Sequence, residues 1–328
     1  MLFTSTLIIL LTGLSVVVVS ATNSDQIPLG ENESHHGKKR YNVTLNFDDI
    51  ETNSSGIGFD PWMGDPNEAL EYNGVYFQSF KVVNVAKALP DLPDPSDLLC
   101  ASSAPNALFS SRKPGYPWPR LSLHNLGRRR YDPDDTHNRT FDMRTVTLRP
   151  TGNVSVEGHD VFVGVQLNLM KLPTSKESSG FPSLFRGSPD IPKGSNVWRA
   201  ALLLFGGGPM QSFKVDFQRF AKIIPGFGTG VDTFEVVADF YIWDDEKEFW
   251  GLQGDWEVCV DDVELEMVKG GQDHDEENAG QQSDEDDDDD KLLFLTVNDD
   301  GDGDVVVGDQ VLGRQLWEQL QNQKTGGK

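Results

Sequence analysis

The chain has 328 residues, two cysteines and a formal net charge of −24. A chain of this length buries a hydrophobic core of ordinary size, which excludes a disulfide-dense miniprotein and fits one large domain with tails or two small domains. Residues 271–328 carry 17 acidic and 4 basic side chains, a net charge of −13, and the remainder carries −11. Because binding to phosphate needs Lys and Arg, the charge argues against nucleic acid and anionic membranes as partners.

The first segment is typical of a secretory signal peptide, predicted over residues 1–21. The stretch from Leu7 to Val19 is almost entirely apolar, and Val19 and Ala21 occupy positions −3 and −1 of a cleavage site after Ala21. The apolar part is shorter than the roughly 20 residues of a membrane-spanning helix, and polar residues follow it. We therefore expect a soluble protein that is secreted to the extracellular space or cell wall. A signal anchor is the alternative.

A basic stretch, Lys38-Lys39-Arg40, ends the polar segment 22–40. This segment has no apolar periodicity and precedes the first strand-like run. One interpretation is a propeptide that a kexin-type protease removes by cutting after Arg40. The other is a basic disordered stub, and the pattern favours neither.

Five glycosylation acceptor motifs agree with a eukaryotic secretory route, because Asn-x-Ser/Thr is the sequence that receives N-linked glycans. The motif is short, so the sequence does not decide which of the five sites carry a glycan. The acceptors are Asn32, Asn42, Asn53, Asn138 and Asn153.

The two cysteines, Cys100 and Cys259, are predicted to form an intramolecular disulfide, which is the default in an oxidising compartment. The bond would close a loop of about 160 residues, and the chain-entropy estimate for such a loop is roughly 5 kcal/mol at most. No histidine flanks either cysteine, which argues against a zinc or catalytic role.

Short alternating apolar runs dominate residues 41–269 and predict an all-β domain. Gly- and Pro-rich turns separate the runs, and none of them has the spacing of an amphipathic helix. Roughly eight to ten antiparallel strands of this kind predict a two-sheet sandwich of jelly-roll type. The main expected strands are 41–47, 75–80, 140–148, 161–169, 198–205, 213–217, 234–243 and 256–267.

Beyond the sandwich the chain divides into an acidic linker, 270–291, and a C-terminal segment, 292–328. The linker contains seven consecutive acidic residues at 284–290, a run that repels itself and stays extended. We interpret it as a solvated linker. Low-affinity cation binding and docking to a basic protein partner are the functional alternatives.

The C-terminal segment contains a stretch that is similar to a single EF-hand or dockerin-type calcium loop. Gly303 falls at the turn position and Val305 at the apolar position of a twelve-residue loop that begins at Asn298. The alternative is a Gly/Asp hairpin that joins 292–297 to 305–307. In the calcium interpretation the ligands are Asn298, Asp300, Asp302, Asp304 and Asp309.

Two acidic motifs mark the ends of the predicted sandwich. The sequence Asn46-Phe47-Asp48-Asp49-Ile50 near its start is echoed by Val260-Asp261-Asp262-Val263 near its end, with short motifs at 76–80, 103–106 and 140–144 between them. In this order the chain resembles the galactose-binding-like jelly-roll β-sandwich proteins, among them secreted fungal proteins of unknown function. More distantly it is similar to carbohydrate-binding modules of that fold and to PEP-CTERM-type surface proteins. The two long loops and the acidic tail depart from that pattern.

The resemblance implies a structural calcium ion where the first and last strands lie side by side. The matching positions are Asp48, Asp49, Asp261 and Asp262. Ca²⁺ takes six to eight oxygen ligands, and carboxylates that lie close together need a cation or protons to compensate their charge. Against this, successive residues of a strand point to opposite faces, which would leave one aspartate of a pair merely solvated.

The sequence contains no nucleophile elbow, metalloprotease helix, P-loop or zinc spacing, so we expect a protein without catalytic activity. Its long connections, 111–138 and 171–196, are the first places to look for a site. Flat exposed rings stack on sugar faces, whereas buried rings fill sandwich cores. The candidates for a sugar platform are Trp62, Tyr116, Trp118 and Trp250.

We therefore predict a secreted sandwich that binds cell-wall or host polysaccharide. Two alternatives from other functional classes remain open. One is a polysaccharide hydrolase or lyase on the same fold, and it needs two facing carboxylates in a cleft. The other is a structural or interaction protein that acts through its acidic tail.

Overall fold

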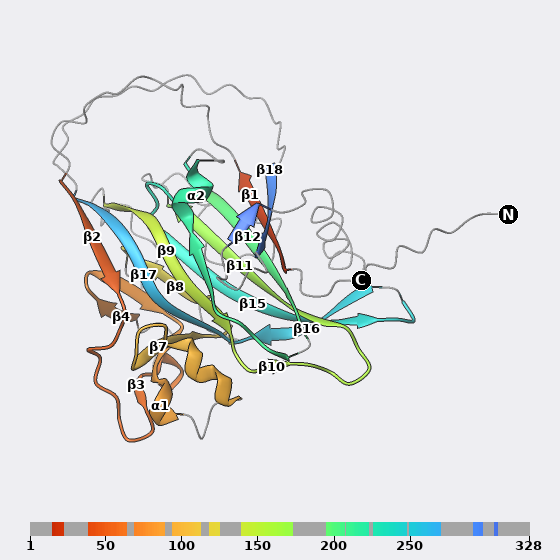
Figure 1. Cartoon of the computed structure of the whole chain (residues 1–328). Helices are drawn as coiled ribbons and strands as arrows, with labels where there is room; N and C mark the ends of the chain where they lie inside the picture. Colours follow the sequence, from red (N-terminus) through yellow and green to blue (C-terminus); the bar gives the residue numbers. More distant parts are fainter. Residues whose placement is uncertain are drawn as a thin grey trace.

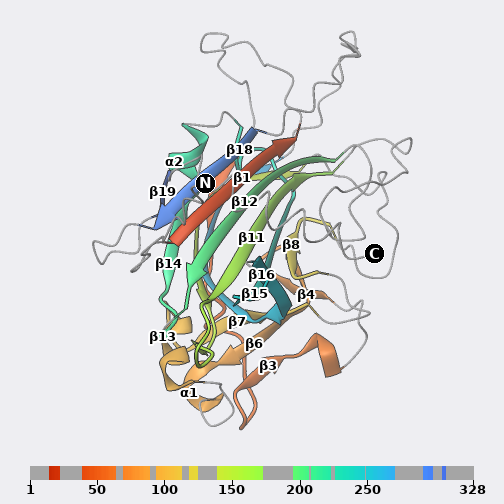
Figure 2. The same cartoon turned by 90° about the vertical axis from the view of Figure 1, so that its right-hand side faces the viewer.

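The computed structural model forms two antiparallel β-sheets that pack face to face as a β-sandwich (Figures 1 and 2). The all-β, two-sheet prediction is therefore confirmed, while the jelly-roll connectivity stays a prediction. In the part of the chain that the structure describes, no helix is long and apolar enough to cross a membrane. The described residues are 15–22, 39–63, 69–88, 94–112, 118–124, 139–172, 195–206, 208–222, 226–247, 249–269, 291–297 and 305–307.

The larger sheet contains ten strands within the described ranges, and its neighbouring strands are antiparallel. Strand β16 (Phe249–Trp256) pairs with β15 beside the main path. The main order is β19 (Val305–Val307), β18 (Lys291–Val297), β1 (Ser15–Thr22), β12 (Asn196–Phe205), β11 (Val161–Lys171), β15 (Thr233–Asp244), β8 (Arg120–Ser122), β5 (Val75–Gln78) and β4 (Ala69–Tyr72).

The smaller sheet has seven strands in the same described part, and β2 (Lys39–Leu45) pairs with its central strand β17. Its order is β14 (Phe213–Asp216), β9 (Thr140–Pro150), β17 (Val258–Lys269), β7 (Asn106–Ser110), β6 (Phe80–Asn84) and β3 (Ile57–Phe59). The remaining elements are the ribbon β10 (Asn153–Val154) and β13 (Gly208–Pro209), the short helices α1 (Val85–Ala88) and α2 (Phe217–Ala221), and the 3₁₀ turns η1 (Pro61–Met63) and η3 (Pro95–Cys100).

The hydrophobic core lies between the two sheets and is built by strand alternation. On β15 the side chains of Phe234, Val236 and Ala238 belong to the core, so the residues between them face outward. Trp198 and Trp256 pack against the core, as the sequence led us to expect. Each sheet therefore has one apolar inner face and one outer face, and any ligand surface on a strand must lie on an outer face.

Two of the runs predicted as single strands, 75–80 and 256–267, each contain a corner at which the chain passes from the larger sheet to the smaller one. The run 75–80 is split at Ser79, whose φ of 58° turns the chain from β5 in the larger sheet to β6 in the smaller one. Likewise β16 ends at Trp256 and β17 begins two residues later in the other sheet. The first long connection also contains a strand, β8, which sequence periodicity missed because it has only three residues.

Three strands from near the two ends of the chain extend the larger sheet beyond β12, in the order β1, β18 and β19. Strand β1, of which all but Thr22 belongs to the predicted signal peptide, pairs with both β12 and β18. Strands β18 and β19 pair antiparallel, with Val297 opposite Val305, as in the hairpin interpretation of this segment. The five candidate calcium ligands of the EF-hand-like loop, residues 270–290 of the acidic linker and residues 308–328 lie outside the described residues.

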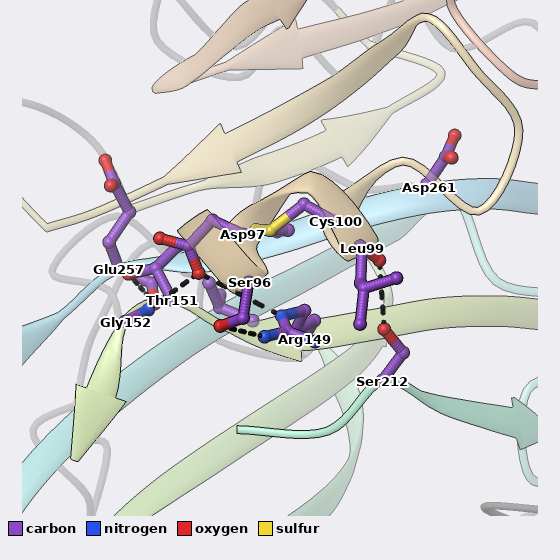
Figure 3. Close-up of a disulfide and its surroundings, with 12 residues drawn as sticks. Ser96, Asp97, Leu99, Cys100, Arg149, Thr151, Gly152, Ser212, Glu257 and Asp261 are labelled. Carbon is purple, nitrogen blue, oxygen red and sulfur yellow. Dashed lines mark hydrogen bonds and ion pairs between the residues drawn. A yellow bond between two sulfur atoms is a disulfide. The ribbon is translucent and has the colours of Figure 1, made fainter. Parts of the chain in front are cut away.

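The predicted disulfide between Cys100 and Cys259 is confirmed, and it ties η3 to β17 (Figure 3). Both cysteines are buried in a small second hydrophobic cluster. Further bonds hold the same turn against β9: Arg149 donates to the Ser96 hydroxyl at 2.9 Å, and the Gly152 N–H donates to the Asp97 carboxylate at 2.8 Å. Burial raises the pKa of Asp97, and the Gly152 N–H together with the Arg149 guanidinium, 4.0 Å away, compensates a carboxylate that has lost its water.

We predict that replacing both cysteines by alanine lowers the free energy of unfolding by about 2–5 kcal/mol, because the cross-link restricts a long loop in the unfolded chain. Urea unfolding of the wild type and of the Cys100→Ala/Cys259→Ala variant measures the difference. Wild-type protein unfolded in a reducing agent is the control and should resemble the variant. Equal urea midpoints for oxidised wild type and variant would contradict the prediction.

Candidate functional site

The acidic motif at the start of the sandwich forms a turn directly after β2. Asp48 accepts a hydrogen bond from the backbone N–H of Asn106 at 3.1 Å, and Asp49 accepts one from the Tyr72 hydroxyl at 2.6 Å. These partners lie on different segments, so the two carboxylates diverge. The Asn106 side chain completes the turn by donating to the carbonyls of Phe47 and Ile50.

The acidic motif at the end of the sandwich lies at an irregularity of β17. The register of β17 against β9 shifts after Asp261, and Asp262 has a φ of 45°, a left-handed conformation that aspartate tolerates better than most residues. As a result both carboxylates reach one hydroxyl: Ser102 Oγ lies 3.1 Å from Asp261 Oδ2 and 2.7 Å from Asp262 Oδ2. The expectation that successive aspartates point to opposite faces fails here because the strand is interrupted.

The two acidic motifs hold the same short segment from opposite ends. Asp261 also accepts the backbone N–H of Ser103 at 2.9 Å, while Asp48 holds Asn106 three residues further on. Antiparallel pairing of β2 with β17 brings the motifs together, with Leu45 opposite Val263. The first and last strands therefore lie side by side, and their aspartates clamp residues 102–106 through hydrogen bonds.

The structure gives these aspartates N–H and O–H partners. Among the described residues, no three or more acidic, histidine or cysteine side chains are grouped so that they could hold a metal ion. The hydrogen-bonded arrangement of Asp48, Asp49, Asp261 and Asp262 does not fit a calcium cage as it stands. A calcium ion at either predicted site stays a prediction.

Asp261 is fully buried, and this burial raises its pKa to about 7, with the neighbouring charge of Asp262 acting in the same direction. The geometry explains why a proton is useful here. The Ser102 hydroxyl carries one hydrogen and faces two carboxylates, so it can donate to only one of them at a time. A proton on the acidic pair would supply the missing donor.

The predicted processing and glycosylation residues fall on the surface where they are described. Arg40 lies in β2, where its backbone pairs with β17 and its guanidinium donates to Asp142 at 2.8 Å. Asn42, Asn53 and Asn153 are exposed, as glycan acceptors must be, and the other two acceptors lie outside the described residues. Cleavage after Arg40 and glycan occupancy stay predictions.

The strongest candidate for a ligand surface lies on the outer face of the larger sheet. Trp250 on β16 is directly opposite Trp243 on β15, and their rings are 5.3 Å apart. Phe162 on the neighbouring strand β11 is paired with Tyr241, and its ring lies 4.7 Å from the Trp250 ring and stacks at 4.5 Å on Tyr241. Both tryptophans are half-buried, so each presents part of its ring to solvent.

Trp118 joins the same face through an arginine. Its ring lies 5.1 Å from the Arg112 guanidinium, which in turn binds the carboxylates of Asp239 on β15 and Asp255 on β16. The contact of an arginine with an aromatic face is stabilising, and a guanidinium held by two carboxylates has a fixed orientation. We call Trp118, Tyr241, Trp243 and Trp250 the aromatic platform.

The platform extends along β15. Asp239 lies four residues before Trp243, which is about 13 Å along a strand. Tyr241 lies between them on the same face, and burial raises its pKa to about 12 although the charge of Arg112 acts in the opposite direction. The tyrosine is therefore uncharged at any physiological pH, and the platform carries no charge on its rings.

The other two aromatic candidates are not part of this platform. Trp62 lies in η1, with the Lys81 ammonium 5.9 Å from its ring centre, on the side of the smaller sheet. Tyr116 lies outside the described residues. Sequence reasoning missed Arg112 and Tyr241, although the alternation of 234–243 places Tyr241 on the same face as Trp243.

Comparison with known proteins adds no relative: no family model matches the chain, and neither a curated protein nor a solved structure matches it.

We predict that the protein loses stability as the pH rises from 5 to 8 because of Asp261. A pKa raised from 3.8 to about 7 means that the folded chain binds the proton more tightly, so the contribution is complete below pH 3.8 and is lost as the pH passes 7. The loss between pH 5 and 8 should be about 2–3 kcal/mol.

Denaturant unfolding at both pH values tests this, and Asp261→Asn should remove the pH-dependent loss whatever its effect on absolute stability. Asp244→Asn is the control, because the hydrogen bond and charge of Lys247 lower the pKa of that exposed carboxyl. An Asp261→Asn variant that keeps the whole pH dependence of the wild type would show that another group is responsible.

Proposed function

We propose that this protein is a secreted, non-catalytic β-sandwich that binds carbohydrate, and that its ligand surface is the aromatic platform on the outer face of the larger sheet. The observation that carries the proposal is the gathering of Trp118, Trp243 and Trp250 on one face from three separate segments. Two of these, Trp118 and Trp250, are candidates for a sugar platform on the sequence alone. The disulfide is consistent with an oxidising compartment and so with secretion.

The chemistry of the platform supports a neutral polysaccharide. The rings offer apolar faces, and the nearby polar groups are already organised, because Arg112 is held between Asp239 and Asp255. A rigid aromatic surface loses little conformational entropy when a ligand binds to it. The resemblance of the chain to galactose-binding-like sandwiches, which include carbohydrate-binding modules, is in line with the same function.

We predict that Trp118→Ala and Trp250→Ala each weaken binding to an insoluble polysaccharide at least tenfold, which corresponds to about 1.4 kcal/mol. Retention of the full-length protein on cellulose, chitin, β-glucan and mannan measures binding. Trp62→Ala is the matched control, because it removes the same side chain at a distance from the platform. Thermal melting of each variant shows whether the fold is preserved.

Two results would overturn the proposal. One is a wild-type protein that no polysaccharide of this panel retains. The other is retention of both platform variants at wild-type strength, which would place any binding elsewhere. Release of reducing sugar or unsaturated product by the wild type would instead favour a hydrolase or lyase on the same fold.

A further inference from the structure

A pocket opens beside the short helix α2, at the β14 edge of the smaller sheet. Its volume is about 280 Å³, and its lining comes from α2 with Lys222, from β9 and from the turn 226–230. Helix α2 packs against β9, as Figure 1 shows. Pockets for drug-sized ligands measure about 300–1,000 Å³, so a pocket of this volume suits a small molecule.

Local sequence signals hold the walls of this pocket in place. Asp216 caps α2, because its carboxylate accepts the backbone N–H groups of Gln218 and Arg219. The turn on the opposite side is tied to β9, where the Met143 N–H donates to the Gly228 carbonyl at 2.7 Å. Gly228 has a φ of 71°, which favours glycine. The pocket is therefore formed by the protein alone and does not need a ligand to shape it.

The pocket has an apolar floor and an open rim. Met143, Phe217 and Phe227 line it and belong to the hydrophobic core, and the two phenylalanine rings stack with their centres 5.9 Å apart. On the rim, Lys222 and Thr229 are exposed to solvent. A ligand that enters from solvent passes polar side chains first and then meets the aromatic floor.

Arg144 is a cation of the lining with a fixed orientation. Its guanidinium forms an ion pair with Glu266, and in the amide orientation that suits both groups the Gln218 oxygen accepts from its Nε at 3.2 Å. The Arg144 side chain nevertheless stays 31% exposed. A guanidinium has five N–H donors, so donors are left for a ligand after these two partners.

Lys222 adds a second cation, which ends α2. It is exposed, and within the described residues it forms no ion pair. Asp142 is the acidic residue of the lining, but both of its oxygens are engaged: one accepts from Arg40 and the other from the Gly230 N–H, each at 2.8 Å. The pocket and its ion-pair partners thus carry three cations and two carboxylates, a net charge of +1 in a chain of −24.

We propose that this pocket binds a small organic monoanion, a carboxylate with a compact apolar body. Arg144 and Lys222 would bind the carboxylate, because a guanidinium matches its two oxygens and a second cation adds attraction. Met143 and Phe227 would contact the apolar body. A net charge of +1 suits one negative charge, and an apolar floor does not suit an inorganic anion, which needs polar partners on all sides. The site is separate from the aromatic platform and does not depend on carbohydrate binding.

The experiment is saturation-transfer NMR on the full-length protein with benzoate, benzamide and sulfate. Benzoate has both the charge and the apolar body, benzamide has nearly the same shape without the charge, and sulfate has charge without the body. We expect benzoate to bind about tenfold more tightly than benzamide, since hydrogen bonds to a charged group are stronger. Sulfate at the same concentration should not displace it.

Two variants test the place of binding. Lys222→Gln removes the unpaired cation, and Ala221→Leu fills the pocket from α2; each should weaken benzoate binding about fivefold or more. Neither residue is buried, so both variants should melt at nearly the wild-type temperature. Lys214→Gln is the matched control, because this exposed lysine on β14 lies outside the lining, near Glu264. It should bind benzoate as the wild type does.

Four results would overturn the proposal: a wild type that does not bind benzoate, equal binding of benzoate and benzamide, displacement of benzoate by sulfate, or wild-type affinity in Ala221→Leu. Equal weakening by Lys214→Gln and Lys222→Gln would also overturn it, because the attraction would then come from the general charge of the surface. Loss of benzoate binding in Lys222→Gln and Ala221→Leu, with polysaccharide retention and melting unchanged, supports the pocket as the site.

Discussion

Strand β17 is the element on which the rest of the sandwich depends, because it is paired along both of its edges. One edge carries β9, and the other carries β7 and then β2. These partners come from positions near the beginning and the middle of the domain, so the sheet closes only when distant parts of the chain meet. The disulfide at Cys259 fixes one end of this strand to η3. Contacts of such high sequence separation are typical of slowly folding β-proteins.

The irregularity in β17 adds a second role to the same strand. A regular strand would send Asp261 and Asp262 to opposite faces, but the shifted register lets both reach Ser102. The turn after β2 supplies Asp48 to the other end of that segment. The protein thus uses the carboxylates of Asp48 and Asp261 as hydrogen-bond acceptors for backbone N–H groups of residues 103 and 106, and the pairing of β2 with β17 brings these two carboxylates to that segment.

The sequence predicts those features of this molecule that depend on repetition. Long strands with regular alternation, such as β11 and β15, were expected nearly at their observed bounds, and two cysteines allow only one pairing. Corners between the sheets are harder to predict. At Ser79 the chain turns with a positive φ, which non-glycine residues seldom adopt, so the residue type gives no signal for the turn. The same limit applies to the proposed ligand surface: residue type identifies Trp118 and Trp250 as candidates, but only strand register shows that Trp250 lies opposite Trp243.

The position of β1 bears on how the larger sheet is completed. The predicted cleavage after Ala21 would remove all but one residue of β1, the strand that lies between β12 and β18. The long strand β12 would then present a bare row of amide and carbonyl groups, the kind of border that recruits another strand. Under the predicted cleavage, β12 would need another strand along this edge, and β18, which pairs with the other edge of β1, is the nearest candidate.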